Sequence, residues 1–311
     1  MNPGRRLFVL VLTVLAFQVV VGACSPAPNP VPTASLSTSP SASAAPSSSA
    51  AVSAPPDTSP PASPGETTTV RTYFYLGGEP GTAGLVPIVR AVPQTQAVAG
   101  AAMTALLAGP TADESTGGVI TSAVPVGSRL LGLSIKNGIA TVDLSGEFES
   151  GGGSASVITR LGQVVYTLTQ FPTVQSVAFE IEGRPARVFS SEGLVLEGPL
   201  GRDDYDDLLP AIYVDQPAYG AGIGNPARIS GSANVFEATF VVTVLDSTGA
   251  PIAQTQAMAT CGTGCRGTFD AIAPYSVLKA GWGTLRVWDG SAKDGSPENV
   301  REYPVWLTPA E

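Results

Sequence analysis

The sequence contains no histidine, and this absence excludes several catalytic chemistries. Histidine is the general base of the Ser-His-Asp and Cys-His mechanisms, and it is a common ligand of catalytic zinc. An acid or base in this chain would have to be a carboxylate, a lysine, a tyrosine or a Ser-Lys pair, and none lies in a recognised motif. The sequence therefore predicts a protein that is not an enzyme and that binds no cofactor.

Charged residues are also scarce, at 13% of the chain, and the acidic ones prevail, so that the formal net charge is -9. Nucleic-acid binding requires clustered lysine and arginine side chains that neutralise phosphates. We therefore expect no nucleic-acid partner. Because 43% of the residues are hydrophobic, the folded part should be globular and should not be an acidic tail.

Cysteine occurs only three times, and the first instance ends an apolar N-terminal stretch. Two arginines precede apolar residues 7–21, and small residues lead to Cys24, which are the three parts of a secretory signal. The apolar run is shorter than the roughly 20 residues of a membrane-spanning helix. An uncleaved signal anchor with an incidental cysteine is the alternative interpretation.

The four residues that end in Cys24, Val-Gly-Ala-Cys, resemble the lipobox read by the lipoprotein signal peptidase, with Val21 where leucine is usual. The resemblance implies that residues 1–23 are a signal peptide and that Cys24 becomes the acylated first residue of the mature protein. Acyl chains such as palmitate would hold the protein at the extracytoplasmic face of the cell membrane, since each buried methylene contributes about 0.8 kcal/mol.

The other two cysteines, Cys261 and Cys265, are separated by a short segment that contains Gly262 and Gly264. Disulfides persist in exported proteins, so we expect these two residues to form a structural disulfide that closes a small loop. A redox pair or half of a metal site is the alternative. Cys-x-x-Cys beside a βαβ unit is more typical of a redox pair, and nearby residues do not complete a metal site.

Residues 24–66 are almost entirely proline, serine, alanine and threonine, and only Asp57 and Glu66 carry charge. Such a segment cannot bury enough apolar surface to offset the entropy of ordering. We therefore expect a disordered tether with an extended reach on the order of 130 Å, at about 3.1 Å per residue. Composition also permits a glycosylated stalk.

Residues 67–205 alternate strand-like and helical patterns. Strands are predicted at 70–76, 85–92, 131–135, 139–144 and 177–181, with a hairpin turn at Asn137-Gly138. Helices are predicted from a cap at Thr95 to Ala108 and from a cap at Ser154 onward. The second helix carries the apolar stripe Ile158, Leu161, Val165 and Leu168. This order predicts an α+β domain in which the helices cover one face of a mixed sheet.

Three stretches of this segment are similar to the GerMN domain, a family named from sporulation and spore germination proteins; they are residues 106–110, 138–145 and 163–172. Members of this family resemble non-catalytic extracytoplasmic modules, and some are related to ring-building domains of envelope channels. The resemblance implies a protein partner in the envelope or self-assembly.

Residues 210–311 show little helical periodicity, and about seven short strand-like runs are separated by turn signals. This pattern predicts an all-β immunoglobulin-like sandwich. Two stretches, residues 232–240 and 291–299, resemble the immunoglobulin-like germination domain that accompanies GerMN.

Two acidic groups and three tryptophans raise alternatives in this second half of the chain. We interpret the acidic run at 203–207 as a solvated linker or the start of a helix. A calcium site is the alternative, because calcium takes oxygen ligands. We interpret a second acidic group as a polar turn and predict no metal there; it consists of Asp289, Asp294 and Glu298. Trp282, Trp288 and Trp306 are expected in the core or on a sheet face. A sugar-stacking platform is the alternative, which would make this a module that binds cell-wall glycan or peptide.

Overall fold

The computed structural model describes residues 66–116 and 119–310, which all belong to one compact unit. The predicted signal peptide, Cys24 and the tether up to residue 65 lie outside the described residues. Within the described part of the chain, no helix combines the length and the apolar character needed to cross a membrane.

The first half of the unit begins with an antiparallel sheet in the order β2-β1-β3, formed by β1 (Thr67–Leu76), β2 (Gly84–Pro93) and β3 (Ile120–Thr121). Along β1, aromatic and β-branched residues pack on both faces, and Tyr73 and Phe74 are completely buried. A strand buried on both faces requires further elements on either side of the sheet.

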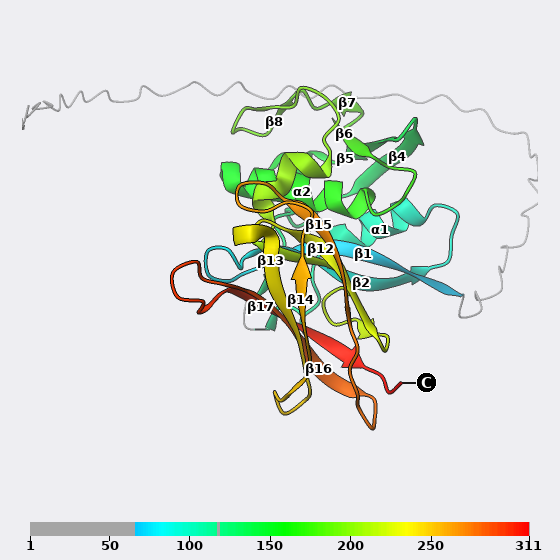
Figure 1. Cartoon of the computed structure of the whole chain (residues 1–311). Helices are drawn as coiled ribbons and strands as arrows, with labels where there is room; N and C mark the ends of the chain where they lie inside the picture. Colours follow the sequence, from blue (N-terminus) through cyan, green and yellow to red (C-terminus); the bar gives the residue numbers. More distant parts are fainter. Residues whose placement is uncertain (1–65, 117–118, 311) are drawn as a thin grey trace, which may run out of the picture. The chain divides into compact units, whose positions relative to one another are not determined.

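A second, mixed sheet has the order β4-β5-β6-β7 and consists of β4 (Leu130–Lys136), β5 (Ile139–Leu144), β6 (Ser176–Ile181) and β7 (Arg184–Pro185). β5 and β6 are parallel, and the other pairs are antiparallel. The predicted turn joins β4 to β5, with positive φ at Asn137 and Gly138. Helices α1 (Val98–Leu107) and α2 (Ser154–Leu168) lie between the two sheets (Figure 1). The expected α+β class, with helices on one face of a mixed sheet, is confirmed. The strands expected at 70–76 and 85–92 form the separate antiparallel sheet on the other side of the helices.

Three local expectations for the helices are wrong. The cap of α1 is Ala97, and Thr95 instead accepts a hydrogen bond from the Ala97 N–H at 3.1 Å. The cap of α2 is Gly153. Ser154 is the first helical residue, and its hydroxyl donates to Glu192 at 2.9 Å. Ile158 is exposed, because the buried face of α2 is centred on Leu161 and its neighbours one turn away.

The hairpin of β8 (Val188–Phe189) and β9 (Leu194–Val195) and the 3-10 helix η3 (Arg202–Leu208) lead from the first half to the second. Another 3-10 helix, η2 (Gly146–Glu149), lies between β5 and α2 within the first half. The acidic run at 203–207 therefore forms a helix start, as one of its two main interpretations predicts. Asp204 accepts a hydrogen bond from the Gly201 N–H at 2.7 Å, and Tyr205 is buried.

The second half is a β-sandwich. One sheet has the order β10-β12-β15 and comprises β10 (Ile212–Gln216), β12 (Ala227–Ala233) and β15 (Gly267–Ala273). The other has the order β11-β17-β16-β13-β14, formed by β11 (Gly222–Ile223), β17 (Pro297–Leu307), β16 (Gly281–Gly290), β13 (Thr239–Leu245) and β14 (Pro251–Met258), with η4 (Phe236–Ala238) before β13. The predicted immunoglobulin-like β-rich class is confirmed.

A continuous cluster of buried apolar side chains runs through both halves, from Phe74 and Val165 to Tyr213, Val242 and Tyr303. A small second cluster forms where β1 meets α1, at Val70, Val92 and Ala102. The continuity of the larger cluster means that the two halves bury apolar surface against each other.

Candidate functional site at the junction of the two halves

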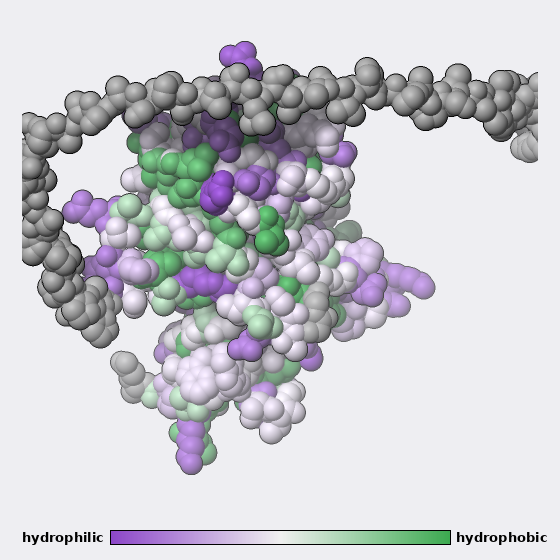
Figure 2. All heavy atoms as spheres, turned by 180° about the vertical axis from the view of Figure 1, so that it is seen from behind, coloured by the Kyte–Doolittle hydropathy of each residue, from purple (hydrophilic) through white to green (hydrophobic). Residues whose placement is uncertain are grey.

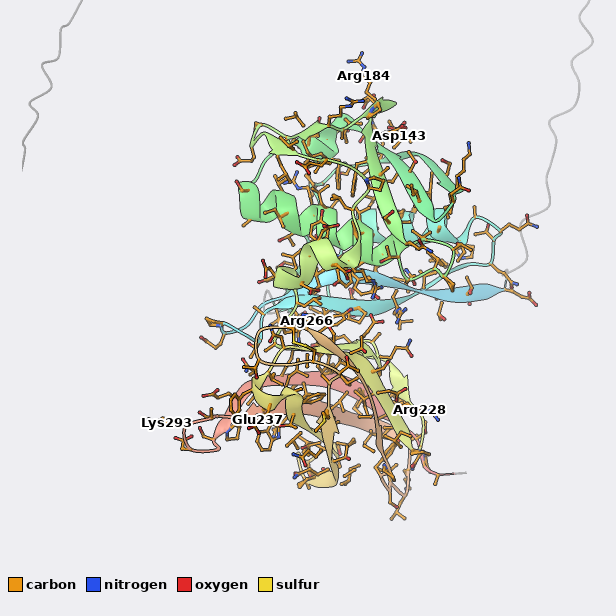
Figure 3. All side chains as sticks on the ribbon, turned by 45° about the horizontal axis from the view of Figure 1, so that its top comes forward. Asp143, Arg184, Arg228, Glu237, Arg266 and Lys293 are labelled. Atoms are coloured by element: carbon orange, nitrogen blue, oxygen red, sulfur yellow. A yellow bond between two sulfur atoms is a disulfide. The ribbon has the colours of Figure 1, made fainter. Side chains whose placement is uncertain are left out.

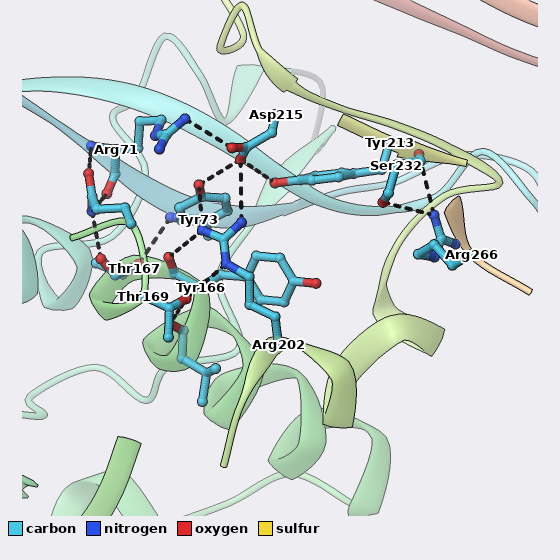
Figure 4. A network of polar contacts seen from close by, with 12 residues as sticks. Arg71, Tyr73, Tyr166, Thr167, Thr169, Arg202, Tyr213, Asp215, Ser232 and Arg266 are labelled. Atoms are coloured by element: carbon cyan, nitrogen blue, oxygen red, sulfur yellow. Dashed lines mark hydrogen bonds and ion pairs between the residues drawn. The ribbon is translucent and has the colours of Figure 1, made fainter. Parts of the chain in front are cut away.

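A half-buried carboxylate, Asp215, lies where β10 of the sandwich meets β1 of the α+β half. It accepts hydrogen bonds from the Tyr73 hydroxyl at 2.7 Å, from the Tyr213 hydroxyl at 2.8 Å and from the Arg71 guanidinium at 3.0 Å (Figure 4). Hydrogen bonds to a charged group are stronger than neutral ones. Three such bonds occupy most of the acceptor positions of this carboxylate, so that it acts as a fixed link between the two halves.

Arg202, at the start of η3, completes the network from a third element (Figure 4). Its guanidinium lies 3.9 Å from Asp215 and 4.6 Å from the centre of the Tyr166 ring, and its Nε donates to the Thr169 hydroxyl at 2.8 Å. Burial alone would lower the pKa of Arg202, but the Tyr73 and Tyr213 hydroxyls and the Asp215 carboxylate outweigh it and raise the pKa. The guanidinium therefore remains charged in this setting.

The two tyrosines that contact Asp215 are held in their neutral form. Burial raises the pKa of both Tyr73 and Tyr213, and the neighbouring Asp215 carboxylate raises it further. A neutral tyrosine hydroxyl can donate to the carboxylate, whereas a phenolate would repel it. Both tyrosine hydroxyls therefore remain hydrogen-bond donors over the physiological pH range.

Arg266, which precedes β15, lies at the same level of the molecule, where the two halves meet (Figure 3). Its guanidinium donates to the Pro210 carbonyl at 3.1 Å and to the Ser232 hydroxyl at 3.4 Å, and it lies 3.9 Å from Asp206. Burial lowers the pKa of Arg266. By contrast, Asp143 and Arg184 project at the far end of the α+β half, and Lys293 projects from the sandwich (Figure 3).

A cavity of about 430 Å³ lies between these groups. Its lining combines charged residues with aromatic and hydroxyl side chains; the residues are Tyr166, Arg202, Asp203, Asp206, Leu209, Tyr213, Asp215, Ser230, Gly231, Ser232, Arg266, Thr268 and Phe269. Within residues 66–116 and 119–310, no group of three or more histidine, cysteine, aspartate or glutamate side chains is placed to hold a metal ion. Arg202 pairs with Asp215 and Arg266 pairs with Asp206, and these contacts can hold the two domains together.

Backbone contacts strengthen the junction on the side of the β1–β2 turn. Arg301 of β17 donates to the carbonyls of Thr82 and Leu85, and the Ala211 N–H donates to the Gly81 carbonyl at 2.8 Å. Gly84 approaches η3 so closely that a Cβ atom there would lie 2.6 Å from the Leu208 carbonyl oxygen. Only glycine fits this approach, since Gly84 also has a φ of +152°.

The residues singled out in the sequence lie away from this junction or at its margin. Cys24 is outside the described residues. Cys261 and Cys265 are joined by a disulfide in the loop between β14 and β15, with 5.8 Å between their Cα atoms. Asp289 accepts a hydrogen bond from Asn299 at 2.8 Å, and Asp294 accepts two from Ser296, which is the geometry of a polar turn.

The junction residues were missed at the level of sequence. One signal was present: Arg71 interrupts an otherwise uncharged strand, and Asp215 follows the apolar residues of β10. Isolated charges in such strands are often buried and paired. Their partners lie 142 and 144 residues apart in the chain, so the pattern alone does not identify them.

Comparison with protein families gives two matches. Residues 71–187 match the Germane family, described as "Sporulation and spore germination". Residues 211–296 match the Gmad2 family, described as "Immunoglobulin-like domain of bacterial spore germination". Both resemblances inferred from the sequence are thereby confirmed. No match is found among curated proteins.

Among solved structures, the chain is similar to the first GerMN domain of the sporulation protein GerM from Bacillus subtilis, with 20% identity and a TM-score of 0.36, over 44% of this chain and 99% of that one. The tandem GerMN domains of the same protein give 15% identity and a TM-score of 0.38, over 79% and 62% of the two chains. A putative lipoprotein from Clostridium perfringens gives 19% identity and a TM-score of 0.32, over 46% and 92%.

Proposed function

The chain combines a Germane domain of the sporulation and spore germination family with the Gmad2 immunoglobulin-like domain, and from this pairing we propose a non-catalytic lipoprotein of the cell envelope. It is anchored through Cys24 at the extracytoplasmic face of the membrane, and it acts through contacts with an envelope protein or with further copies of itself. The observation that carries the proposal is the junction at Asp215, because its hydrogen bonds with Arg71 and Tyr73 link the two domains.

The chemistry of the junction supports a non-catalytic role. A general base must be free to accept a proton from a substrate, whereas Asp215 already accepts hydrogen bonds from Tyr73, Tyr213 and Arg71. Tyr73 and Tyr213 are in turn buried and engaged. These groups stabilise the domain arrangement through the hydrogen bonds that they make to one another.

The exposed apolar side chains of the edge strand β4 favour a role in binding a protein partner. β4 lies at one end of the sheet β4-β5-β6-β7 and pairs with β5 on one side only. Two of its apolar side chains, Leu131 and Ile135, are 48% and 38% exposed. Apolar side chains gather in separate patches in the upper part of the molecule, where the Germane domain lies, as Figure 2 shows for one face. An exposed apolar edge strand is a template for pairing with a strand of another chain.

Site-specific photo-crosslinking in cells tests the contact role. A photoreactive residue at position 131, on β4, is expected to give a discrete adduct, whose mass distinguishes a second copy of this chain from another envelope protein. The matched control is position 248, which is exposed in the turn between β13 and β14. Absence of an adduct at 131, or equal adducts at both positions, would count against a contact through β4.

The substitution Cys24→Ser tests the anchor. We expect the protein to leave the membrane fraction, because the acyl chains can no longer be attached. The matched control is the double variant Cys261→Ser, Cys265→Ser, which removes the other two cysteines and should remain in the membrane fraction. Continued membrane retention of Cys24→Ser would refute lipid anchoring at this residue.

Binding of cell-wall glycan is the second candidate function. It is favoured by two exposed tryptophans, Trp282 and Trp306, beside a groove that Trp282 helps to line.

A further inference from the structure

Two tryptophans lie side by side on the outer face of the five-stranded sheet. Trp282 on β16 and Trp306 on β17 are direct cross-strand partners, and their side chains remain 54% and 39% exposed. Their ring centres are 5.4 Å apart, and the ring planes are nearly perpendicular, at 85°. Their location on a sheet face agrees with one of the expectations from sequence. Such large exposed aromatic surface commonly marks a binding site.

Trp282 forms part of one wall of a groove of about 450 Å³. The same side of the groove comprises Tyr219, Gly220 and Pro304 of the sandwich. The facing side comes from the Germane half and consists of Ile88, Val89, Asp113, Glu114, Thr116 and Val119. The groove therefore exists only because the two domains are held together, and the Tyr219 N–H donates to the Pro87 carbonyl at 2.9 Å beside it.

The Germane side of the groove offers fixed hydrogen-bond acceptors. Both carboxylate oxygens of Glu114 receive hydrogen bonds from the Arg90 guanidinium at 2.6 Å, and one also receives the Thr111 N–H at 2.8 Å. Burial alone would raise the pKa of Glu114, but these donors outweigh it and lower the pKa. The carboxylate is thus ionised and held in place, and exposed Asp113 lies beside it.

We propose that this groove binds a pyranose glycan. A pyranose ring has an apolar face of C–H groups, which can stack on the exposed indole of Trp282. Its rim of hydroxyl groups can donate to the exposed carboxylate of Asp113 and to Oε1 of Glu114, which accepts a single hydrogen bond, whereas Oε2 already accepts two. Trp306 is a positioning residue, because its perpendicular ring packs against Trp282 and restricts its orientation. This inference rests on the second candidate function and not on the anchor or on a protein partner.

The properties of the groove favour a glycan over other occupants. Its volume is in the range of pockets for small ligands. A stable protein interface is a different kind of site, because it buries a surface of about 800 Å² on each partner. The formal net charge of -9 and the carboxylates on one wall disfavour an anionic lipid surface. The combination of an aromatic wall and an acceptor wall matches a ligand with one apolar face and many hydroxyl donors.

Titration of residues 60–311, the compact unit, with chitohexaose tests the proposal. Isothermal titration calorimetry gives the affinity of each variant, since the intrinsic fluorescence of the chain combines the emission of Trp282, Trp288 and Trp306. We expect saturable binding, and we expect Trp282→Ala to weaken it by more than about tenfold, as truncation of an aromatic anchor does. Trp282→Phe should retain most of the affinity, because a ring face remains.

The matched control is Trp288→Ala. Trp288 lies on the same strand and the same face, but it lines a different cavity beside Phe236 and Gln256. Its loss should leave chitohexaose affinity unchanged. Glu114→Gln, which keeps the shape of the side chain, should weaken binding without preventing folding, and circular dichroism verifies the fold of each variant.

Three outcomes would overturn the glycan site: no binding to chitohexaose or to isolated cell wall, an equal loss in Trp282→Ala and Trp288→Ala, or Trp282-dependent binding to phosphatidylglycerol vesicles in place of the sugar. None of these outcomes bears on the anchor or the contact role, because membrane retention of the full chain and crosslinking at position 131 are measured separately. Failure of the glycan site and failure of the main proposed function are therefore distinguishable.

Discussion

Asp215 joins three elements through one side chain. β1 supplies Arg71 and Tyr73, β10 supplies Tyr213, and the start of η3 supplies Arg202. The contribution of such a group lies less in the net strength of its bonds than in the cost of leaving its partners unpaired. Removal of the carboxylate would leave two arginines and two tyrosine hydroxyls without their common acceptor.

We therefore expect Asp215→Ala to lower the free energy of unfolding by about 2–3 kcal/mol. Urea denaturation of residues 60–311, followed by tryptophan fluorescence, measures the effect. The control Asp270→Ala removes an exposed carboxylate from β15 and should change the stability by less than about 0.5 kcal/mol. Equal effects of the two substitutions would show that Asp215 has no special role at the junction.

At this scale the sequence predicts residues whose partners are close in the chain. The pairing of Cys261 with Cys265 and the polar turn at Asp294 follow from short spacings. Asp215 was not predicted, because its partners Arg71 and Tyr73 approach it only after the two domains have packed. The groove at Trp282 was not predicted for the same reason, since its two walls come from different domains.

Helix α2 illustrates how one element can stabilise the edge of another. A polar stripe on α2 hydrogen-bonds with the backbone of β1 at Arg71 and Tyr73. The stripe consists of Gln163 and Thr167 on α2 and is continued by Gln170, which follows the C-cap of the helix. β1 is the middle strand of its sheet, but β3 pairs with it only at Tyr75 and Leu76. Backbone groups on an unpaired strand edge must be covered or paired, and side-chain amide and hydroxyl groups replace a neighbouring strand along this part of β1.

The substitution Gln163→Met tests this role with little change in volume. Gln163 is completely buried, donates to the Tyr73 carbonyl at 2.9 Å and accepts from the Ala123 N–H at 2.8 Å. Methionine would leave both backbone groups unsatisfied, so we expect a loss of about 2–3 kcal/mol in urea denaturation. Gln254→Met on exposed β14 is the control and should have almost no effect. A neutral Gln163→Met would contradict the account of the β1 edge.

The positions of the elements follow from the sequence better than their ends and faces do. The Asn137-Gly138 turn and the alternation in β5 and β6 locate those strands. The predicted apolar stripe located α2, but it included Ile158, which is exposed. The prediction did not include the buried polar side chains of the same helix. Hydrophobic periodicity treats glutamine as a surface residue, so it cannot identify glutamines that are buried because they satisfy a backbone.

For the whole molecule, the sequence predicts two domains, at 67–205 and 210–311, and the structure joins both through a continuous core and a shared polar network. The α+β class and the sandwich follow from the order of elements and from the spacing of turns. The packing of one domain on the other does not, because it depends on close approaches such as that of Gly84 to Leu208. The proposed glycan groove depends on this packing, because its two walls come from different domains.

Differential scanning calorimetry of residues 60–311 tests the rigid union of the two domains most directly. Because the domains share a core, we predict a single transition in which the calorimetric and van't Hoff enthalpies agree. Two resolved transitions, or a calorimetric enthalpy well above the van't Hoff value, would contradict the account, because the Germane and immunoglobulin-like domains would then unfold independently.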